Sequence, residues 1–177
     1  MAGIRETCVA VGLVVAVLTA PAPAQAADSA QARGGHPQAA PSVTGGWRLR
    51  MLAEVNATRR AAGVPALALC PRLNRVAEAR ARAMAASDTF GHLDREGRTP
   101  ADRMTAGGYR WTLAGENIAA NQRRVPAVMA AWLDSPTHLA TMTEARFTHV
   151  GFGHARDRSG PYRTLWVQDY GAGGRCS

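Results

Sequence analysis

The chain has 177 residues, of which 46% are hydrophobic and 19% charged, and its 21 basic and 13 acidic residues give a formal net charge of +8. This composition predicts a folded globular protein and excludes a wholly disordered one, and no apolar run reaches the roughly eighteen residues of a membrane span. All the basic residues are arginine, which excludes chemistry that needs a lysine, such as a Schiff base or a phosphate-binding loop.

Residues 1–26 have the pattern of a secretory signal peptide. Arg5 precedes an apolar stretch from Cys8 to Ala20, and the segment ends in Ala24-Gln25-Ala26, the small-x-small pattern that precedes a cleavage site. The stretch is short for a bilayer, so we expect a secreted protein, in the extracellular space or cell envelope, with no membrane span after cleavage. The alternative is a retained membrane anchor.

Two cysteines, Cys70 and Cys176, remain once the signal peptide is removed. Export to an oxidising compartment and an even count favour one disulfide between them. Closing a loop of this length stabilises a chain by about 4 to 5 kcal/mol in the chain-entropy model. The alternative is two free thiols.

The rest of the chain divides into a tether, a domain and a tail. Residues 27–46 are rich in Ala, Gly, Pro, Ser and Gln, with too little apolar surface to offset the entropy of ordering, so they predict a flexible tether. A single domain is expected over residues 47–171, followed by a short tail, 172–177, that carries Cys176.

Helices dominate the first half of the predicted domain. Leu52, Val55, Asn56 and Arg59 share one helical face, ahead of a break at Gly63. We interpret Asn56 and Arg59 as a buried hydrogen-bonding pair. A second helix is expected from 71 to about 87, and a third from Thr99-Pro100, a helix-start signal, to 107.

Strands dominate the second half. We expect a short strand at 115–118, a helix at 125–133, a short turn at 135–138, and two closing strands at 148–153 and 164–170. Helices followed by strands predict an α+β layered domain.

Three titratable residues stand beside turn-forming residues and are the candidates for chemistry: His92, Glu116 and His138. Motifs containing them occur in a fixed order with others, namely Asn56-x-x-Arg59, Gly63 with Leu67, Leu73, Arg82-Ala83, Phe90-x-His92, Gly108-Tyr109, Gly115-Glu-Asn-Ile-Ala119, Trp132-x-x-Ser135-x-x-His138, Phe147-x-x-Val150-Gly-x-Gly153 and Trp166-Val-Gln168. Together they resemble the bacterial branch of the CAP superfamily, the SCP-like extracellular proteins.

The resemblance implies an α-β-α sandwich with a cleft lined by two histidines and two acids, which in some members holds a divalent metal. His92, Glu116 and His138 match three of these four positions, and Ser135 stands where eukaryotic members have the second acid. Asp134 is the neighbouring acid that could replace it.

Two imidazoles and a carboxylate match the ligand set of an open Zn²⁺ site, where bound water could act as a nucleophile. The alternative is a hydrogen-bonded cluster that satisfies polar groups lining a cleft.

Two functions follow from the resemblance. The first, favoured by the missing second acid, is an extracellular binding module for a small apolar ligand, an envelope component or an extracellular protein. The second is a metal-dependent hydrolase or peptidase of the envelope. Nucleic acid is not expected as a partner, because the arginines are dispersed and form no basic run. We expect a monomer.

Overall fold

The computed structural model describes residues 10–14, 46–158 and 160–177. Its elements follow one another as β1 (Ala10–Val14), α1 (Trp47–Ala61), β2 (Ala68–Leu69), α2 (Pro71–Ser87), α3 (Pro100–Ala106), β3 (Leu113–Ala120), α4 (Val125–Leu133), α5 (Pro136–Met142), β4 (His149–Arg156) and β5 (Thr164–Ala172). The order of helices first and paired strands last is the one predicted.

The strands form one five-stranded sheet in the order β1-β3-β5-β4-β2. Every pairing is antiparallel except that of β2 with β4. β3 and β5 pair along their whole lengths, and in this register Glu116 lies directly opposite Asp169. β5 is therefore the centre of the sheet, and β1 forms an edge against β3.

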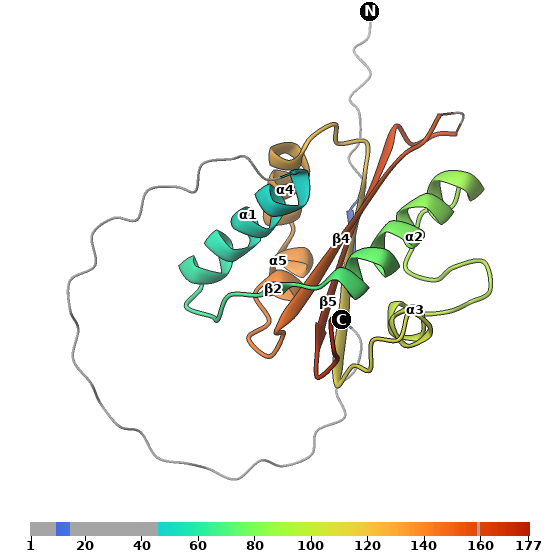
Figure 1. Ribbon diagram of the computed structural model, residues 1–177. Helices are drawn as coiled ribbons and strands as arrows, with labels where there is room; N and C mark the ends of the chain where they lie inside the picture. Colours follow the sequence, from blue (N-terminus) through green and yellow to red (C-terminus); the bar gives the residue numbers. More distant parts are fainter. Residues whose placement is uncertain (1–9, 15–45, 159) are drawn as a thin grey trace, which may run out of the picture.

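Helices cover both faces of the sheet, which gives the α-β-α sandwich that the resemblance implies. Figure 1 shows α2 and α3 on one side of the strands and α1, α4 and α5 on the other. The two faces have separate cores: Trp132, Phe152 and Tyr170 are fully buried in one, and Ile118 and Val167 pack with α2 in the other.

α2 approaches the sheet at two glycines of β4. A Cβ atom on Gly151 would overlap the backbone of α2 at Leu73, and one on Gly153 would overlap it at Ala77. Because glycine has no side chain, these two positions let the backbone of α2 pack directly against the backbone of β4.

The starts of α3 and α5 share a hydroxyl residue followed by proline, but only α3 has a side-chain cap. Thr99 caps α3 in a capping box with Asp102, and Pro100 occupies its first turn. Ser135 and Pro136 begin α5 in the same order. The prediction of a short turn at 135–138 was wrong, because these residues are the start of a helix.

Two polar residues of α1 hold neighbouring segments in place. Asn56 exchanges two hydrogen bonds with the backbone of Leu67, at 2.8 and 3.0 Å. Arg59 is fully buried and donates to the carbonyl oxygens of Pro65, Met142, Glu144 and Phe147. Both residues therefore make the structural hydrogen bonds that were predicted, each to backbone atoms.

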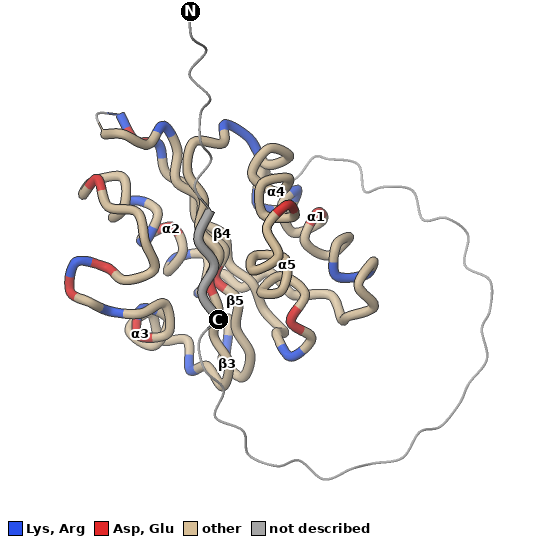
Figure 2. The backbone as a smooth tube through the Cα atoms, turned by 180° about the vertical axis from the view of Figure 1, so that it is seen from behind, with Lys and Arg blue, Asp and Glu red and all other residues tan. Residues whose placement is uncertain are grey.

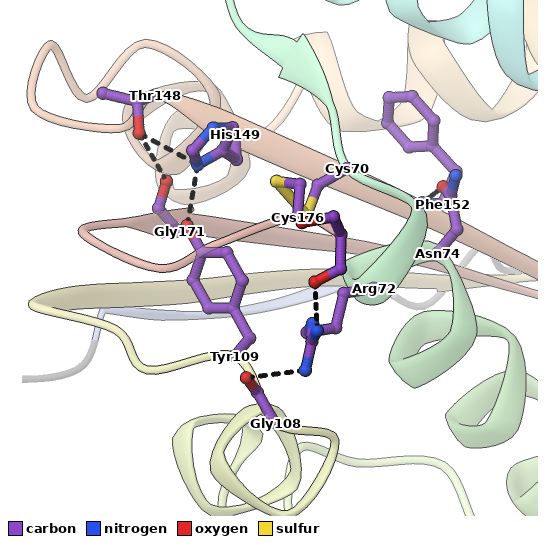
Figure 3. The surroundings of a disulfide bond; sticks show 11 residues. Cys70, Arg72, Asn74, Gly108, Tyr109, Thr148, His149, Phe152, Gly171 and Cys176 are labelled. Atoms are coloured by element: carbon purple, nitrogen blue, oxygen red, sulfur yellow. Dashed lines mark hydrogen bonds between the residues drawn. A yellow bond between two sulfur atoms is a disulfide. The ribbon is translucent and has the colours of Figure 1, made fainter.

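The disulfide between Cys70 and Cys176 is confirmed, with the two Cα atoms 4.9 Å apart. It joins the residue before α2 to the C-terminal tail, and in Figure 3 it lies beside Arg72, whose guanidinium donates to the carbonyl oxygens of Gly108 and Ser177. The tail is thereby tied to the α2–α3 side of the domain.

The two N-terminal predictions concern segments that are mostly undescribed. Of residues 1–26 only 10–14 are described, as the edge strand β1, and of the tether only Gly46 is described. Signal-peptide cleavage and the flexibility of the tether remain predictions. Within the described residues, no helix is long and apolar enough to cross a membrane.

Candidate functional site

Glu116 reaches its surroundings from the middle of β3, where successive side chains point to opposite faces of the sheet. Ala114 and Ile118, two residues to either side, pack in the cores beneath α2 and α3. Glu116 therefore projects from the same face, and it is completely buried. A carboxylate at such a position needs charged or hydrogen-bonding partners.

Those partners come from the loop between α2 and α3 and from α3 itself. His92 Nδ1 lies 2.8 Å from Glu116 Oε1, and Arg103 Nη2 lies 2.7 Å from Glu116 Oε2. Arg103 also donates through Nη1 to the carbonyl oxygens of His92 and Arg98. The guanidinium thus fixes the loop that presents the imidazole, and both oxygens of Glu116 are engaged.

Asp169 adds a second acid that the sequence analysis did not identify. It faces Glu116 across the β3–β5 ladder and is only 1% exposed. Burial, followed by the neighbouring carboxylate of Glu116, raises the pKa of Asp169 well above its usual value, and the charges of Arg103 and Arg80 oppose the shift. A protonated Asp169 can share its hydrogen with Glu116, which keeps the pair compatible with burial.

His138 lies in the other layer of the sandwich. Its backbone carbonyl accepts a hydrogen bond from Asn117 Nδ2 at 3.1 Å, and Asn117 also bonds to Gln168. Because Asn117 follows Glu116 on the same strand, the two side chains leave opposite faces of the sheet. The structure brings His92 and Glu116 into contact and places the backbone of His138 across the sheet from them.

The remaining predicted site residues lie at the ends of α4 and α5. Ser135 is the N-cap of α5, and its hydroxyl lies 3.2 Å from that of Thr137. Asp134 is exposed at the end of α4. The two residues therefore stand in the layer of α4 and α5, across the sheet from the carboxylate of Glu116.

The arrangement does not fit a bound divalent metal. Within residues 10–14, 46–158 and 160–177, no three His, Cys, Asp or Glu side chains are grouped so that they could hold a metal ion. In addition, the guanidinium of Arg103 already supplies a positive charge at Glu116. We use the name β3 acid cluster for Glu116 and the three charged or polar residues described around it: His92, Arg103 and Asp169.

Two other histidines take structural positions on opposite faces of β4. His149 Nδ1 lies 2.9 Å from the hydroxyl of Tyr109, as Figure 3 shows, and His154 packs on Trp166 with ring centroids 4.1 Å apart. Burial lowers the pKa of both imidazoles, so both favour the neutral form.

Comparison with known proteins identifies the family. The model of the cysteine-rich secretory protein family, CAP, matches residues 52–170, which include all four residues of the β3 acid cluster. The chain belongs to this family. The CAP match contains every predicted site residue except Cys176.

Two relatives of this CAP chain come from one bacterium. It is 29% identical over 131 residues to the uncharacterized protein YkwD of Bacillus subtilis, covering 74% of this chain and 49% of YkwD. It is 33% identical over 70 residues to the uncharacterized membrane protein YlbC of the same organism, covering 40% of this chain and 20% of YlbC. The chain thus spans half or less of the curated relatives it matches.

Two solved structures share the CAP fold. An extracellular protein containing an SCP domain from Bacillus anthracis superposes with a TM-score of 0.64 at 26% identity, covering 72% of this chain and 41% of that one. An outer surface protein of Borrelia burgdorferi gives a TM-score of 0.61 at 20% identity, covering 73% of this chain and 92% of that one, and supports the fold alone.

Proposed function

We propose that this CAP chain is a secreted or surface-exposed binding module, and that its ligand is an extended apolar peptide segment bound along the edge of β3. The predicted signal peptide supports export, as do the family description and the Bacillus anthracis relative, which is described as an extracellular protein. The ligand class comes from the edge strand.

The observation that supports a peptide ligand is the pairing of β1 with β3. Ala10–Val14 lies antiparallel to β3 over five residue pairs, from Ala10 opposite Ala119 to Val14 opposite Gly115. These five residues fall inside the predicted signal peptide, so cleavage would remove the strand and leave the main chain of β3 without a neighbour on that side. An unpaired edge is a template for an added strand.

The edge also carries the predicted cleft residues. Glu116 and its partner His92 flank it on the α3 side, and Asn117 and the backbone of His138 flank it on the α5 side. All eight residues of β3 are buried while β1 is present. A ligand with a free main chain satisfies this edge through ladder hydrogen bonds, and apolar side chains at alternate positions suit its buried surroundings.

The β3 acid cluster argues against the hydrolase alternative. A general base needs a lone pair free to accept a proton from water or substrate. Both oxygens of Glu116 are already engaged, one with His92 and the other with Arg103. The cluster therefore supports a positioning role, holding the α2–α3 loop against the edge.

The test uses the secreted protein harvested from the medium and labelled with ¹⁵N. The probe is a synthetic peptide with the sequence of residues 10–14, flanked by arginines for solubility. The matched control is the same peptide with Gly12→Pro, which removes a main-chain donor and disfavours a strand. We expect saturable amide shifts in residues 113–120 with the probe and none with the control.

Three results would overturn the proposal. Secreted protein that still contains residues 10–14 would have no vacant edge. Shifts that avoid β3, or that are equal with the proline peptide, would place binding elsewhere. Cleavage of the probe, detected by mass spectrometry, would support the hydrolase instead.

A further inference from the structure

A concave site lies in the helical layer of α2 and α3, on the opposite side of the sheet from α1, α4 and α5. It has a volume of about 430 Å³ and is lined by residues of α2, of the loop after it and of α3, with none from β3. The size is within the usual range for sites that hold small molecules. We call it the α2–α3 pocket, and nothing in the proposed function uses it.

The pocket combines an apolar wall with an excess of positive charge. Val76, Ala79 and Ala83 of α2 supply the apolar wall. Five arginines line the pocket against two acids, Asp94 and Glu96. In Figure 2, blue and red segments alternate along the loop between α2 and α3, on the side of the sheet away from α1.

The two acids are already engaged. Arg98 donates to Asp94 at 2.8 Å and to Glu96 at 3.2 Å. Arg103 is committed to Glu116. Positive charge therefore remains on the other three lining arginines, which have no hydrogen-bonded carboxylate among the described residues: Arg75, Arg80 and Arg95.

Arg80 is the buried member of these three arginines. It is only 3% exposed, and its Nη2 donates to the carbonyl oxygens of Gly91 and Leu93. Its Nε is buried with no hydrogen-bond partner in the described part of the chain, and the same holds for Nε of Arg103. Burial, followed by the charge of Arg103, lowers the pKa of Arg80. The carboxylates of Glu116, Asp94 and Asp169 oppose this shift, so the positive charge of the pocket that no carboxylate balances lies mainly on Arg75 and Arg95.

We propose that the α2–α3 pocket binds a small amphipathic anion, with its carboxylate or phosphate held by Arg75, Arg80 and Arg95 and its apolar part against Ala79 and Ala83. Guanidinium groups match such oxyanions because their parallel N–H donors bind two oxygens at once. The helix wall offers methyl groups and no competing polar side chain at these two positions. The shared ligand chemistry is an oxyanion with an attached alkyl group.

Isothermal titration of the secreted protein with four probes tests both halves of the proposal. The probes are inorganic phosphate, octyl phosphate, octanoate and octyl glucoside, which has the same tail without charge. We expect octyl phosphate or octanoate to bind at least about tenfold more tightly than phosphate and octyl glucoside, and the preference between the two to identify the head group. Affinity should fall as salt is raised from about 50 to about 300 mM.

Two surface variants locate the site without disturbing the buried arginines. Arg75→Gln removes a lining charge, and Ala79→Glu places a negative charge on the exposed wall, so each should weaken binding by about fivefold or more. Arg82→Gln is the matched control, because Arg82 lies on the same helix, is exposed and does not line the pocket. It should leave the affinity unchanged.

Equal affinity for octyl phosphate and octyl glucoside would show that the charged head group is not recognised. Equal affinity for phosphate and octyl phosphate would show that the alkyl chain is not bound. Either result would overturn the proposal. No binding of any probe, or equal effects of Arg75→Gln and Arg82→Gln, would overturn the site. Because no probe here is a peptide, these results are independent of the β3 edge.

Discussion

Replacing Arg59 with methionine should cost the domain a large part of its stability. Arg59 donates to four main-chain carbonyl oxygens: 2.7 Å to Pro65, 2.7 Å to Met142, 2.9 Å to Glu144 and 3.3 Å to Phe147. These carbonyls belong to the segment after α1, the end of α5 and the approach to β4. One side chain thus links the segment after α1 to the segment between α5 and β4, which lies far along the sequence.

The magnitude follows from the groups left behind. Each buried carbonyl that loses its donor costs about 1 kcal/mol or more, which gives roughly 4 kcal/mol for four. Relief of the cost of burying a guanidinium offsets part of this, and the imperfect fit of methionine adds to it. We expect the free energy of unfolding to fall by about 3 to 5 kcal/mol, out of the roughly 5 to 15 typical of a domain.

Guanidinium chloride unfolding followed by tryptophan fluorescence measures this loss, since Trp132 and Trp166 are buried in the core that Arg59 borders. Arg59→Lys should give an intermediate loss, because an ammonium keeps the charge without the planar fork. Arg60→Met is the matched control, at an exposed position one residue along α1, and should change stability by less than about 0.5 kcal/mol. A loss below about 1 kcal/mol for Arg59→Met would refute the reasoning.

Three further predictions concern stability. Double substitution of Cys70 and Cys176 by alanine should lower the free energy of unfolding by about 4 to 5 kcal/mol in urea, and reduction of the wild type should reproduce the loss; an unchanged midpoint would contradict it. Because burial lowers the pKa of His154, the unfolded state binds its proton first, so thermal stability should fall below pH 6.5 and fall less in His154→Phe. Because the pKa of Asp169 is raised, the folded state holds that proton longer, so stability should decline as pH rises above 3.8 towards the raised value; Asp169→Asn should remove this decline, and parallel pH profiles would refute it.

Local signals in the sequence predict most of the helices because their ends carry distinctive residues. Pro71 and Pro100 stand in first turns, and Gly107 follows the last residue of α3. α5 was missed although Ser135-Pro136 is the same type of start as Thr99-Pro100. With seven residues the helix is too short to show a periodic apolar face, so the cap was its only signal.

The β3 acid cluster could be predicted only in part. The family motifs named His92 and Glu116, and the structure places them in contact. Arg103 and Asp169 have no local pattern that distinguishes them from exposed charges. Their role depends on the β3–β5 register and on where α3 packs, and both are properties of the tertiary fold.

The position of His138 shows a second limit of sequence reasoning. Strand alternation predicts that Glu116 and Asn117 point to opposite faces, but the sequence does not state which helix covers which face. The structure places α5 on the Asn117 side. A ligand at the edge of β3 would therefore lie between His92 and His138, and the two residues could contact it from opposite sides without contacting each other.

The use of arginine in place of lysine has a structural reason in this chain. Arg59, Arg80 and Arg103 are all buried, and each donates to at least two backbone carbonyls from other segments. A planar guanidinium with five fixed donors can do this, whereas an ammonium presents three donors from one point. At least three of the 21 basic residues therefore act inside the fold. The net charge of +8 is therefore a poor guide to the charge of the surface. The placement of Arg75, Arg80 and Arg95 around one pocket is better evidence for an anionic partner than the net charge of the whole chain.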